Sequence, residues 1–358
     1  MKITAGISNI DDYVNLVKAG VDEVFCGYVP YEWNKKYKTL FPLNRREVLY
    51  YNVQIGSFED MKILAKMMQH YKVPVSITLN YLYYVDKQYE EIALIIKSLM
   101  DIGFTDFIIG DLALIIYLQE QNIKCNIHLS GECSELNKTA INFFNRFSNI
   151  SRFIFHRKNT LSDIKSCINI DHNLVLNNNN ISNREYEAFM LNEMCHYTGA
   201  YCSSLHCDEF SHICKLPYEL MDFNEADSNI DCIDKTIEDL NVSNYDAAVD
   251  SYETDNNEMS YYLLGETGCG LCALKSLRDA GITHLKVVGR GLSIEDIEKD
   301  VRNLKLALKI LEENPNITDQ EFKVAVQNKF FKNGCSGKCY YKFSDNLNSL
   351  YSQLDICK

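Results

Sequence analysis

The first half of the chain alternates short apolar runs with amphipathic stretches, and this alternation restricts the possible folds more than any other feature. Apolar runs that fit β-strands lie at residues 2–7, 23–28, 74–80, 106–111, 124–130 and 152–157. Between them, apolar residues recur at helical spacing over residues 10–19, 57–71, 89–102, 112–121, 134–147 and 160–168. Strands that alternate with helices in this way are typical of a parallel sheet.

Two later strand candidates favour a closed sheet over an open one. Residues 186–191 form a seventh candidate, with residues 173–177 as a rival, and residues 285–289 form an eighth. Eight strands with helices between them predict an α/β fold of the (β/α)8 TIM-like barrel type, regular or imperfect. An open doubly wound sheet is the alternative. No Gly-x-Gly-x-x-Gly turn follows the first strand, so the dinucleotide-binding fingerprint is absent.

The remainder of the chain divides by composition and by helix signals. Residues 293–296 form a capping sequence, Ser-Ile-Glu-Asp, that predicts a long helix ending before Pro315, and a second helix is predicted over residues 319–331. We therefore expect the barrel over residues 1–291 and a C-terminal helical extension with a cysteine-containing tail over residues 292–358. An acidic segment at about 222–260 is predicted to be an exposed insertion within the barrel domain.

Net charge and hydropathy exclude several classes of function. The formal net charge is −13, which argues against non-specific nucleic-acid binding driven by counterion release. No run of about 18 apolar residues occurs, so no membrane span is expected. The first residues lack the apolar core of a signal peptide. We expect a cytoplasmic protein, in a compartment that keeps thiols reduced.

The chain contains 14 cysteines, and many of them are grouped at short spacings. In a reducing compartment such groups favour metal ligation over disulfides, whereas Cys26, Cys125 and Cys167 lie inside apolar runs and are expected to be buried as small hydrophobic residues. Four thiolates suit a 4Fe–4S cluster or tetrahedral zinc about equally well. Cys335 and Cys339 could contribute to a second metal, complete the same site or be free thiols.

Several sequence features occur in an order that resembles a known family. Glu187-Ala188-Phe189 precedes Cys195, and six residues separate Cys195 from Cys202. Cys269, a helical stretch, Ala280-Gly281 and the run Lys-Val-Val-Gly-Arg at residues 286–290 follow later. Together with residues 18–24, residues 78–80, Asp111 and Arg157, this order resembles the collagenase-like peptidases of family U32 over residues 1–291. That family includes RNA-hydroxylation proteins and the paired proteins of anaerobic ubiquinone hydroxylation.

The resemblance implies a 4Fe–4S cluster, with zinc as the alternative. Its ligands would be Cys195, Cys202, Cys214 and Cys269, with Cys272 one helical turn away as a substitute for the last. Cys214 is favoured over other cysteines nearby because it begins a Cys-x-x-Pro turn. The chain departs from the family pattern at three places, which weakens any transfer of substrate residues: Gly199 comes one residue early, Asn192-Glu193 replaces Gly-Ala, and Val288 replaces Glu.

Three functions are compatible with the resemblance. The first is an iron–sulfur enzyme of the oxygen-independent hydroxylation type that acts on an unidentified substrate, either RNA or a small aromatic molecule. The second is a metal-dependent or collagenase-like peptidase, although no Gly-x-Ser-x-Gly or His-Glu-x-x-His motif supports proteolysis. The third is a non-catalytic, cluster-bearing subunit that binds a protein partner.

Substrate-binding candidates follow from the barrel architecture, because chemistry in such barrels lies at the carboxyl ends of the strands. The polar residues expected there are Arg45, Asn80, Asp111, Arg157 and Arg290. Three arginines at one end would suit a substrate that bears a carboxylate. The alternative is that each arginine pairs with a neighbouring acidic residue, and that Asp111 only caps the helix that follows it.

Overall fold

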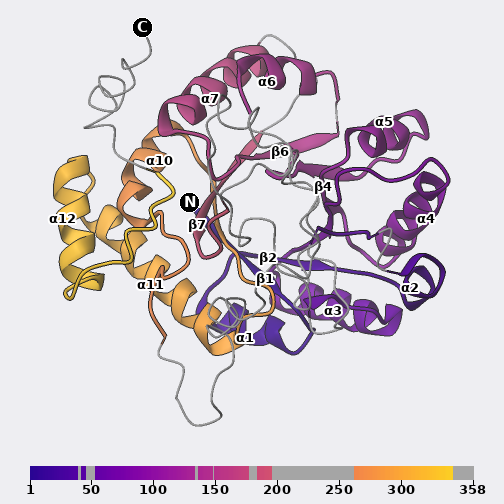
Figure 1. Cartoon of the computed structure of the whole chain (residues 1–358), viewed down its shortest axis with the longest axis horizontal. Coiled ribbons are helices and arrows are strands. Elements are labelled where there is room, and N and C mark those ends of the chain that lie inside the picture. Colours follow the sequence, from indigo (N-terminus) through magenta and orange to yellow (C-terminus); the bar gives the residue numbers. More distant parts are fainter. Residues whose placement is uncertain are drawn as a thin grey trace, which may run out of the picture. The chain divides into compact units, whose positions relative to one another are not determined.

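The chain folds around a closed barrel of eight parallel strands (Figure 1). The computed structural model describes residues 1–38, 42–45, 53–133, 136–147, 149–176, 184–195 and 262–341. The ring closes where β1 pairs with β8, with Lys2 opposite His284, so the barrel prediction is confirmed and the open sheet is excluded. The strands are β1 (Lys2–Ile7), β2 (Glu23–Gly27), β3 (Val75–Leu79), β4 (Asp106–Ile109), β5 (Asn126–Leu129), β6 (Ile150–Ile154), β7 (Glu185–Leu191) and β8 (His284–Val287).

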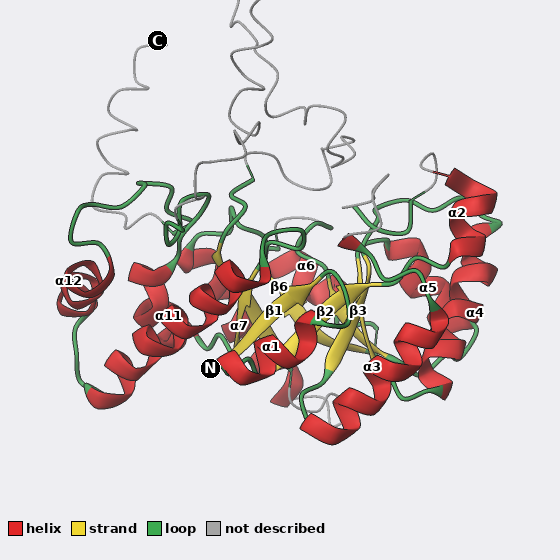
Figure 2. Cartoon of the chain, turned by 90° about the horizontal axis from the view of Figure 1, so that it is seen from below, coloured by secondary structure: helices red, strands yellow, loops and turns green. Residues whose placement is uncertain are grey.

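Helices surround the strands on the outside of the barrel (Figure 2). Their starts follow local capping chemistry: the hydroxyls of Ser57 and Ser293 each accept a hydrogen bond from the backbone N–H three residues later. The helices are α1 (Asp12–Ala19), α2 (Tyr31–Tyr37), α3 (Phe58–Tyr71), α4 (Gln88–Asp101), α5 (Leu112–Glu120), α6 (Lys138–Phe144), α7 (Leu161–Leu176), η8 (Leu271–Ala273), α10 (Leu274–Ala280), α11 (Ile294–Glu313) and α12 (Asp319–Phe330).

Two details differ from the expectations for the sixth and seventh strands. The rival strand at residues 173–177 is wrong, because α7 continues to Leu176. The sixth strand ends at Ile154, earlier than expected, because the Asn159 side chain accepts a hydrogen bond from the His156 backbone N–H (3.1 Å) and turns the chain. This turn places His156 and Arg157 at the carboxyl end of the barrel.

A charged network, which we call the inner network, crosses the barrel interior. Both Arg152 terminal nitrogens donate to the Glu23 carboxylate (2.8 and 2.7 Å), and one of them also donates to Glu187 (2.8 Å). Lys286 donates to the other Glu187 oxygen (2.6 Å). All four side chains are buried. Arg152 also donates to the half-buried Glu185 (3.0 and 2.7 Å). A buried charge without a partner is costly, so these residues stabilise the barrel only as a set.

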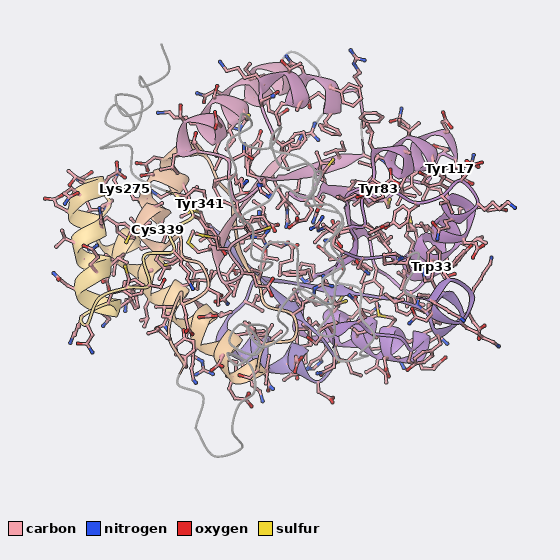
Figure 3. All side chains as sticks on the ribbon, in the orientation of Figure 1. Trp33, Tyr83, Tyr117, Lys275, Cys339 and Tyr341 are labelled. Atoms are coloured by element: carbon pink, nitrogen blue, oxygen red, sulfur yellow. The ribbon has the colours of Figure 1, made fainter. Side chains whose placement is uncertain are left out.

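The C-terminal helices lie beside the barrel on the side of α1 and α10 (Figure 1). Helix α11 contacts α1, β1 and β8, and its Asp300 accepts a hydrogen bond from Asn192 (2.7 Å). Helix α12 contacts η8 and α10, and Figure 3 places Cys339 and Tyr341 on this side of the molecule. The division between residues 291 and 292 stays a prediction, and the predicted insertion at 222–260 lies outside the described residues.

No helix in the described part of the chain is long and apolar enough to cross a lipid bilayer.

Candidate functional site at the carboxyl end of the barrel

Two of the predicted arginines meet at one carboxylate. Glu132, which follows β5, accepts a hydrogen bond from Arg157 (2.7 Å), which follows β6. Arg45, from the connection after β2, forms an ion pair with the same carboxylate (3.4 Å). The Arg157 guanidinium also lies over the ring of Phe189 in β7, 3.9 Å from its centre, as in a cation–π contact. We call Arg45, Glu132 and Arg157 the arginine cluster.

The two arginines hold Glu132 in its charged form. Burial opposes ionisation of Glu132, but the charges of Arg157 and Arg45 outweigh it and lower its pKa to about 2. His156 adds no charge near neutral pH, because its burial lowers its pKa to about 4. The His156 Nε2 atom is buried and has no hydrogen-bond partner among the described residues. Two guanidinium groups therefore share one carboxylate at this end of the barrel.

The third arginine follows β8 and donates to side chains of two other segments. Arg290 donates to the Thr78 hydroxyl (3.1 Å) and the Gln54 side-chain oxygen (3.4 Å). Its guanidinium also lies 5.8 Å from the centre of the Phe25 ring. Because Thr78 belongs to β3, Arg290 links the end of β8 to a strand that lies beyond β1 and β2 in the barrel.

Asn80 and Asp111 have local roles that the structure defines. The Asn80 side chain accepts a hydrogen bond from the Arg45 backbone N–H (3.2 Å), which fixes the chain beside the arginine cluster. Asp111 caps α5 by accepting from the Ala113 backbone N–H (2.7 Å). The other Asp111 oxygen accepts from Tyr84 N (2.9 Å) and the Tyr89 hydroxyl (3.1 Å). The helix-cap interpretation of Asp111 is therefore observed, and its role in chemistry stays a prediction.

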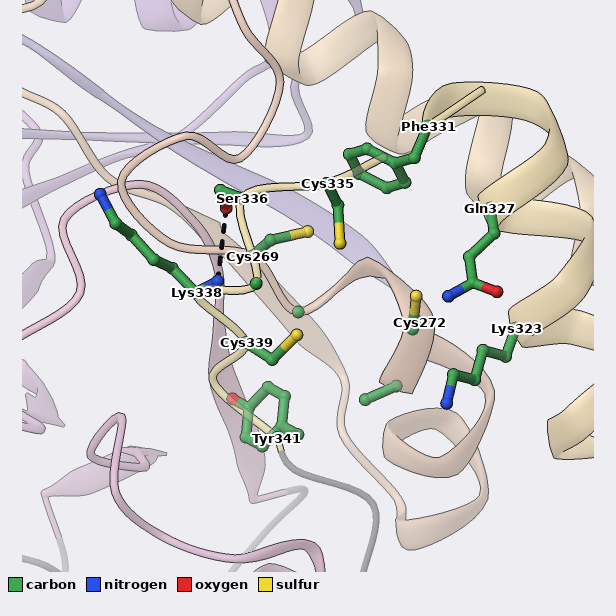
Figure 4. A pocket seen from close by; sticks show the side chains of 13 residues that line it. Cys269, Cys272, Lys323, Gln327, Phe331, Cys335, Ser336, Lys338, Cys339 and Tyr341 are labelled. Carbon is green, nitrogen blue, oxygen red and sulfur yellow. Dashed lines mark hydrogen bonds between the residues drawn. The ribbon is translucent and has the colours of Figure 1, made fainter. Parts of the chain in front are cut away.

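Four cysteines from two distant parts of the sequence line one pocket, which we call the thiol pocket. Its thiols belong to Cys269, Cys272, Cys335 and Cys339. Figure 4 shows that these four side chains point toward a common space, with Phe331 and Tyr341 at its edges. No group of three or more His, Cys, Asp or Glu within the described ranges is arranged to hold a metal ion as it stands.

Backbone pairing at the end of β7 builds this pocket. Cys269 pairs with Leu191 on one side and with Cys339 on the other. The Cys269 N–H donates to the carbonyl of Lys338 (2.9 Å), and the Tyr340 N–H donates to the carbonyl of Cys269 (2.9 Å). The backbone pairing thus continues beyond the end of β7 through three neighbouring segments, which contain residues 191, 269 and 339.

The thiols of Cys269 and Cys272 are in an environment that favours the neutral form. Burial raises the pKa of Cys269 to about 12, against a hydrogen bond from the Leu271 backbone N–H that lowers it. Burial likewise raises the pKa of Cys272 to about 11. Bare thiolates are therefore disfavoured here unless a cation compensates them.

The predicted metal ligands do not all fall in the described structure. Cys195 follows a short extension of β7, in which Asn192 N donates to Gly268 O (2.9 Å) and Met194 N donates to Thr267 O (2.7 Å). Cys202 and Cys214 lie outside the described residues. Cys269 and Cys272 are brought together, as expected, but with Cys335 and Cys339 as their neighbours. In the sequence, the only signal for this grouping of four cysteines was the short spacing within each pair.

Comparison with known proteins decides the family. A model described as peptidase family U32 matches residues 8–348. The chain belongs to peptidase family U32. This result confirms the resemblance seen in residues 187–202 and 269–290.

Solved structures similar to this family member share little sequence with it. "The Structure of the U32 Peptidase Mk0906" is 7% identical with a TM-score of 0.40, and covers 55% of this chain and 71% of its own. The phosphoribosyl anthranilate isomerase from Thermus thermophilus is 8% identical with a TM-score of 0.42, and covers 86% of this chain and 100% of its own. Neither likeness carries an argument about function. No curated protein matches the sequence.

Proposed function

We propose that this U32-family chain is an iron–sulfur enzyme of the oxygen-independent hydroxylation type. Its substrate would carry an anionic group that the arginine cluster and Arg290 bind. A peptidase and a non-catalytic subunit with a protein partner are the alternatives, and RNA or a small aromatic molecule is the class of substrate that the family suggests. The proposed location is the cytoplasm, where reduced thiols remain available as ligands.

One observation carries the proposal. The extension of β7 places residues 192–194 against residues 267–268, with N–H···O distances of 2.9 and 2.7 Å. Cys195 therefore follows directly after the segment that pairs with the approach to Cys269. Phe189, in the same strand, stacks under Arg157. The end of β7 therefore lies next to Cys195, to the approach to Cys269 and to the Arg157 guanidinium.

In this proposal, cysteine thiolates would hold a 4Fe–4S cluster. Cys195, Cys202 and Cys214 would supply thiolates, with Cys269 or Cys272 as the fourth. The N–H of Leu271, which already donates to the Cys269 sulfur, is the kind of donor that stabilises a ligating thiolate. When bound, the cluster would supply electron transfer, which the side chains cannot provide.

The chain's own residues would bind and orient the substrate. Arg157 is held by Glu132 on one side and by the Phe189 ring on the other, so its guanidinium has little freedom. A planar group fixed in this way can donate two parallel hydrogen bonds to a carboxylate or phosphate. Arg290, which donates to Thr78, would provide a second donor.

The test is the metal content of protein purified without oxygen. We expect about four irons and a matching amount of sulfide per chain, with broad visible absorption. Single Cys→Ala changes at 195, 202 and 214 should each remove most of the iron. Cys125 is a buried cysteine directly before β5, and Cys125→Ala should leave the iron unchanged.

Two results would count against the proposal. Colourless protein that stays free of iron after anaerobic reconstitution with iron and sulfide would remove the redox function. Cleavage of casein or gelatin by iron-free protein, at a rate that Arg157→Gln does not alter, would favour the peptidase instead.

A further inference from the structure

His156 and Arg157, which follow β6 at the carboxyl end of the barrel, each have a buried nitrogen atom without a hydrogen-bond partner among the described residues. These atoms are His156 Nε2 and Arg157 Nε. We propose that they form one oxyanion subsite, in which the uncharged imidazole of His156 and the guanidinium of Arg157 donate to the same carboxylate or phosphate group. This inference rests on the anion binding that the proposed function assigns to Arg157, and it does not depend on the iron–sulfur cluster.

A backbone hydrogen bond decides which nitrogen of His156 carries the proton. The Lys158 backbone N–H donates to His156 Nδ1 (3.2 Å), so Nδ1 is the acceptor of the ring. A neutral imidazole has one N–H group, and the nitrogen that accepts a hydrogen bond is the one without the proton. The proton of His156 is therefore on Nε2, which is a donor on the far side of the ring from Lys158.

The imidazole of His156 is uncharged near neutral pH. Burial is the main cause that lowers its pKa to about 4, and the charges of Arg157, Lys158 and Arg45 act in the same direction. The carboxylate of Glu132 acts against them and does not outweigh them. At neutral pH, Nε2 is thus a neutral N–H donor beside a charged one.

The turn that contains His156 is fixed by Asn159. The Asn159 side-chain oxygen accepts from the backbone N–H groups of His156 (3.1 Å) and Leu136 (3.3 Å), and the Asn159 amide donates to the Leu136 carbonyl (2.8 Å). The Asn159 backbone N–H also donates to the His156 carbonyl (3.0 Å). With Nδ1 held by Lys158 as well, the imidazole has little freedom, and a donor fixed before binding loses little entropy when a ligand arrives.

Arg157 is held by contacts that leave its Nε atom unused. Glu132 accepts from Nη1 (2.7 Å), and the Phe189 ring packs against the face of the guanidinium at 3.9 Å. Tyr340 also interacts with Arg157, but none of these contacts satisfies Nε. Nε lies on the guanidinium edge away from Nη1, and such an edge can donate two parallel hydrogen bonds to a carboxylate or phosphate.

An anion would satisfy both donors at once. Most buried polar groups in proteins have a hydrogen-bond partner, and a buried group without one lowers stability. Both side chains lie near Glu132, which accepts from Arg157 and whose charge acts on the pKa of His156. Two unpartnered donors on consecutive residues, at the end of the barrel where such folds bind substrates, therefore indicate a ligand oxygen.

Two substitutions at residue 156 separate the unpartnered donor from the fixed acceptor. In His156→Gln, the side-chain amide nitrogen can reach the position of Nε2 and keep the donor. In His156→Asn, the side-chain oxygen takes the position of Nδ1, which keeps the acceptor for Lys158 and loses the donor. Binding through Nε2 therefore predicts that Gln is tolerated better than Asn, whereas an imidazole with a purely structural role predicts the reverse order.

The experiment measures the Kd values of phosphate and citrate for the full-length protein, from shifts of the melting temperature over a concentration series. We expect Kd to rise about tenfold or more in His156→Asn and by less than about threefold in His156→Gln. The anion whose binding depends more strongly on residue 156 identifies the ligand class as carboxylate or phosphate.

His284→Gln is the matched control for these variants. His284 is also buried and also has its pKa lowered to about 4. Its two ring nitrogens, however, have partners in the Thr283 hydroxyl (2.8 Å) and the Arg152 guanidinium (3.1 Å). This variant should keep the wild-type Kd values, even where its melting temperature is lower.

Two further measurements test whether one anion contacts both residues. The double variant His156→Asn/Arg157→Gln should weaken binding by less than the product of the two single effects, because both residues would serve the same ligand group. The wild-type Kd for sulfate, whose charge is constant in this range, should be unchanged between about pH 8 and pH 5.5, since His156 donates as a neutral group throughout.

Three results would overturn the inference. They are wild-type binding in His156→Asn, a larger loss in His156→Gln than in His156→Asn, and sulfate binding that strengthens severalfold as the pH falls through about 6.5, as a cationic imidazole requires. Loss of binding in Arg157→Gln alone would exclude His156 and keep the anion binding of the proposed function, whereas a wild-type protein that binds no anion would exclude both. Iron-free protein with the expected order of Kd values would remove the hydroxylation function and leave the subsite intact.

Discussion

The inner network and the arginine cluster are both buried groups of charges, but their balance is different. In the inner network, Arg152 and Lys286 are matched by Glu23 and Glu187, and donor–acceptor distances lie between 2.6 and 2.8 Å. At the carboxyl end, Arg45 and Arg157 share the single carboxylate of Glu132. The first group contains at least as many carboxylates as cations, because Arg152 also binds Glu185. In the second group, two guanidinium groups contact the same carboxylate.

This difference separates structure from function. The inner network needs no ligand, because its charges have partners within the protein. A mutation that breaks this network should therefore lower the free energy of unfolding. Guanidinium groups at strand ends can donate hydrogen bonds to an anion, and strand ends are where barrels bind substrates. The comparison therefore predicts that mutations in the inner network act on stability and that mutations in the arginine cluster act on anion binding.

The largest effect is expected from Arg152→Met. This change removes the cation that Glu23, Glu185 and Glu187 share, and breaking a buried pair in this way costs about 3–5 kcal/mol of unfolding free energy. Urea unfolding followed by circular dichroism measures it. Arg157→Met should cost clearly less, since Arg45 still neutralises Glu132. Equal losses in the two variants would contradict the division between the two regions.

The next effect is on the pH dependence of stability. His156 has its pKa lowered from 6.5 to about 4 in the folded chain, so the unfolded chain takes up a proton first as the pH falls. Stability should therefore be complete above pH 6.5 and decrease down to about pH 4, by roughly 3 kcal/mol at most. His156→Gln should remove this slope in urea unfolding across that range.

The inner network provides the matched control for this measurement. Burial also lowers the pKa of His284, beside Arg152, to about 4. His284→Gln should therefore remove a slope of similar size, and the double variant should be nearly flat between pH 6.5 and 5. A wild-type protein whose stability does not change over this range would show that neither histidine is held neutral.

A smaller effect is expected for anion binding. Arg157→Gln removes a charged donor, and hydrogen bonds to charged groups contribute about 1.5–3 kcal/mol, which is about 10–150-fold in affinity. Phosphate and citrate should each raise the melting temperature of wild type more than that of the variant. Arg152→Met, although less stable, should keep the full upward shift. An identical shift in wild type and Arg157→Gln would remove the cluster as the binding group.

The sequence was sufficient for the barrel but not for either charged group. Strands such as residues 2–7 and 186–191 are evident because buried parallel strands are continuous apolar runs. Arg152 and Glu23, however, are 129 residues apart, and only barrel closure reveals that they touch. Helix α2 was not anticipated either, because its buried Trp33 lies among polar and charged neighbours.

Individual residues of the candidate site could be predicted from the sequence, but which of them lie together could not. Residues at strand ends, such as Arg157 and Arg290, follow from barrel architecture, whereas Glu132 lies in a loop with no periodic signal. The cysteine pairs were visible at short spacing, but their grouping depends on residues 335–341 returning to the end of β7, more than 140 positions away. Local rules identify such ligands, and only tertiary contacts decide which ones share a site.

The smallest effect is expected from an exposed ion pair. It tests whether an ion pair at the surface stabilises the chain as much as a buried one. Arg302 and Glu298 form an exposed pair on one face of α11 at 2.7 Å, as close as the contacts in the inner network. Because water screens exposed charges, Arg302→Ala should cost only about 0.3–0.5 kcal/mol of unfolding free energy and should leave the phosphate shift unchanged. A loss above about 1 kcal/mol would mean that short ion-pair distances stabilise this chain irrespective of depth. The contrast between the inner network and the arginine cluster would then need a basis other than burial.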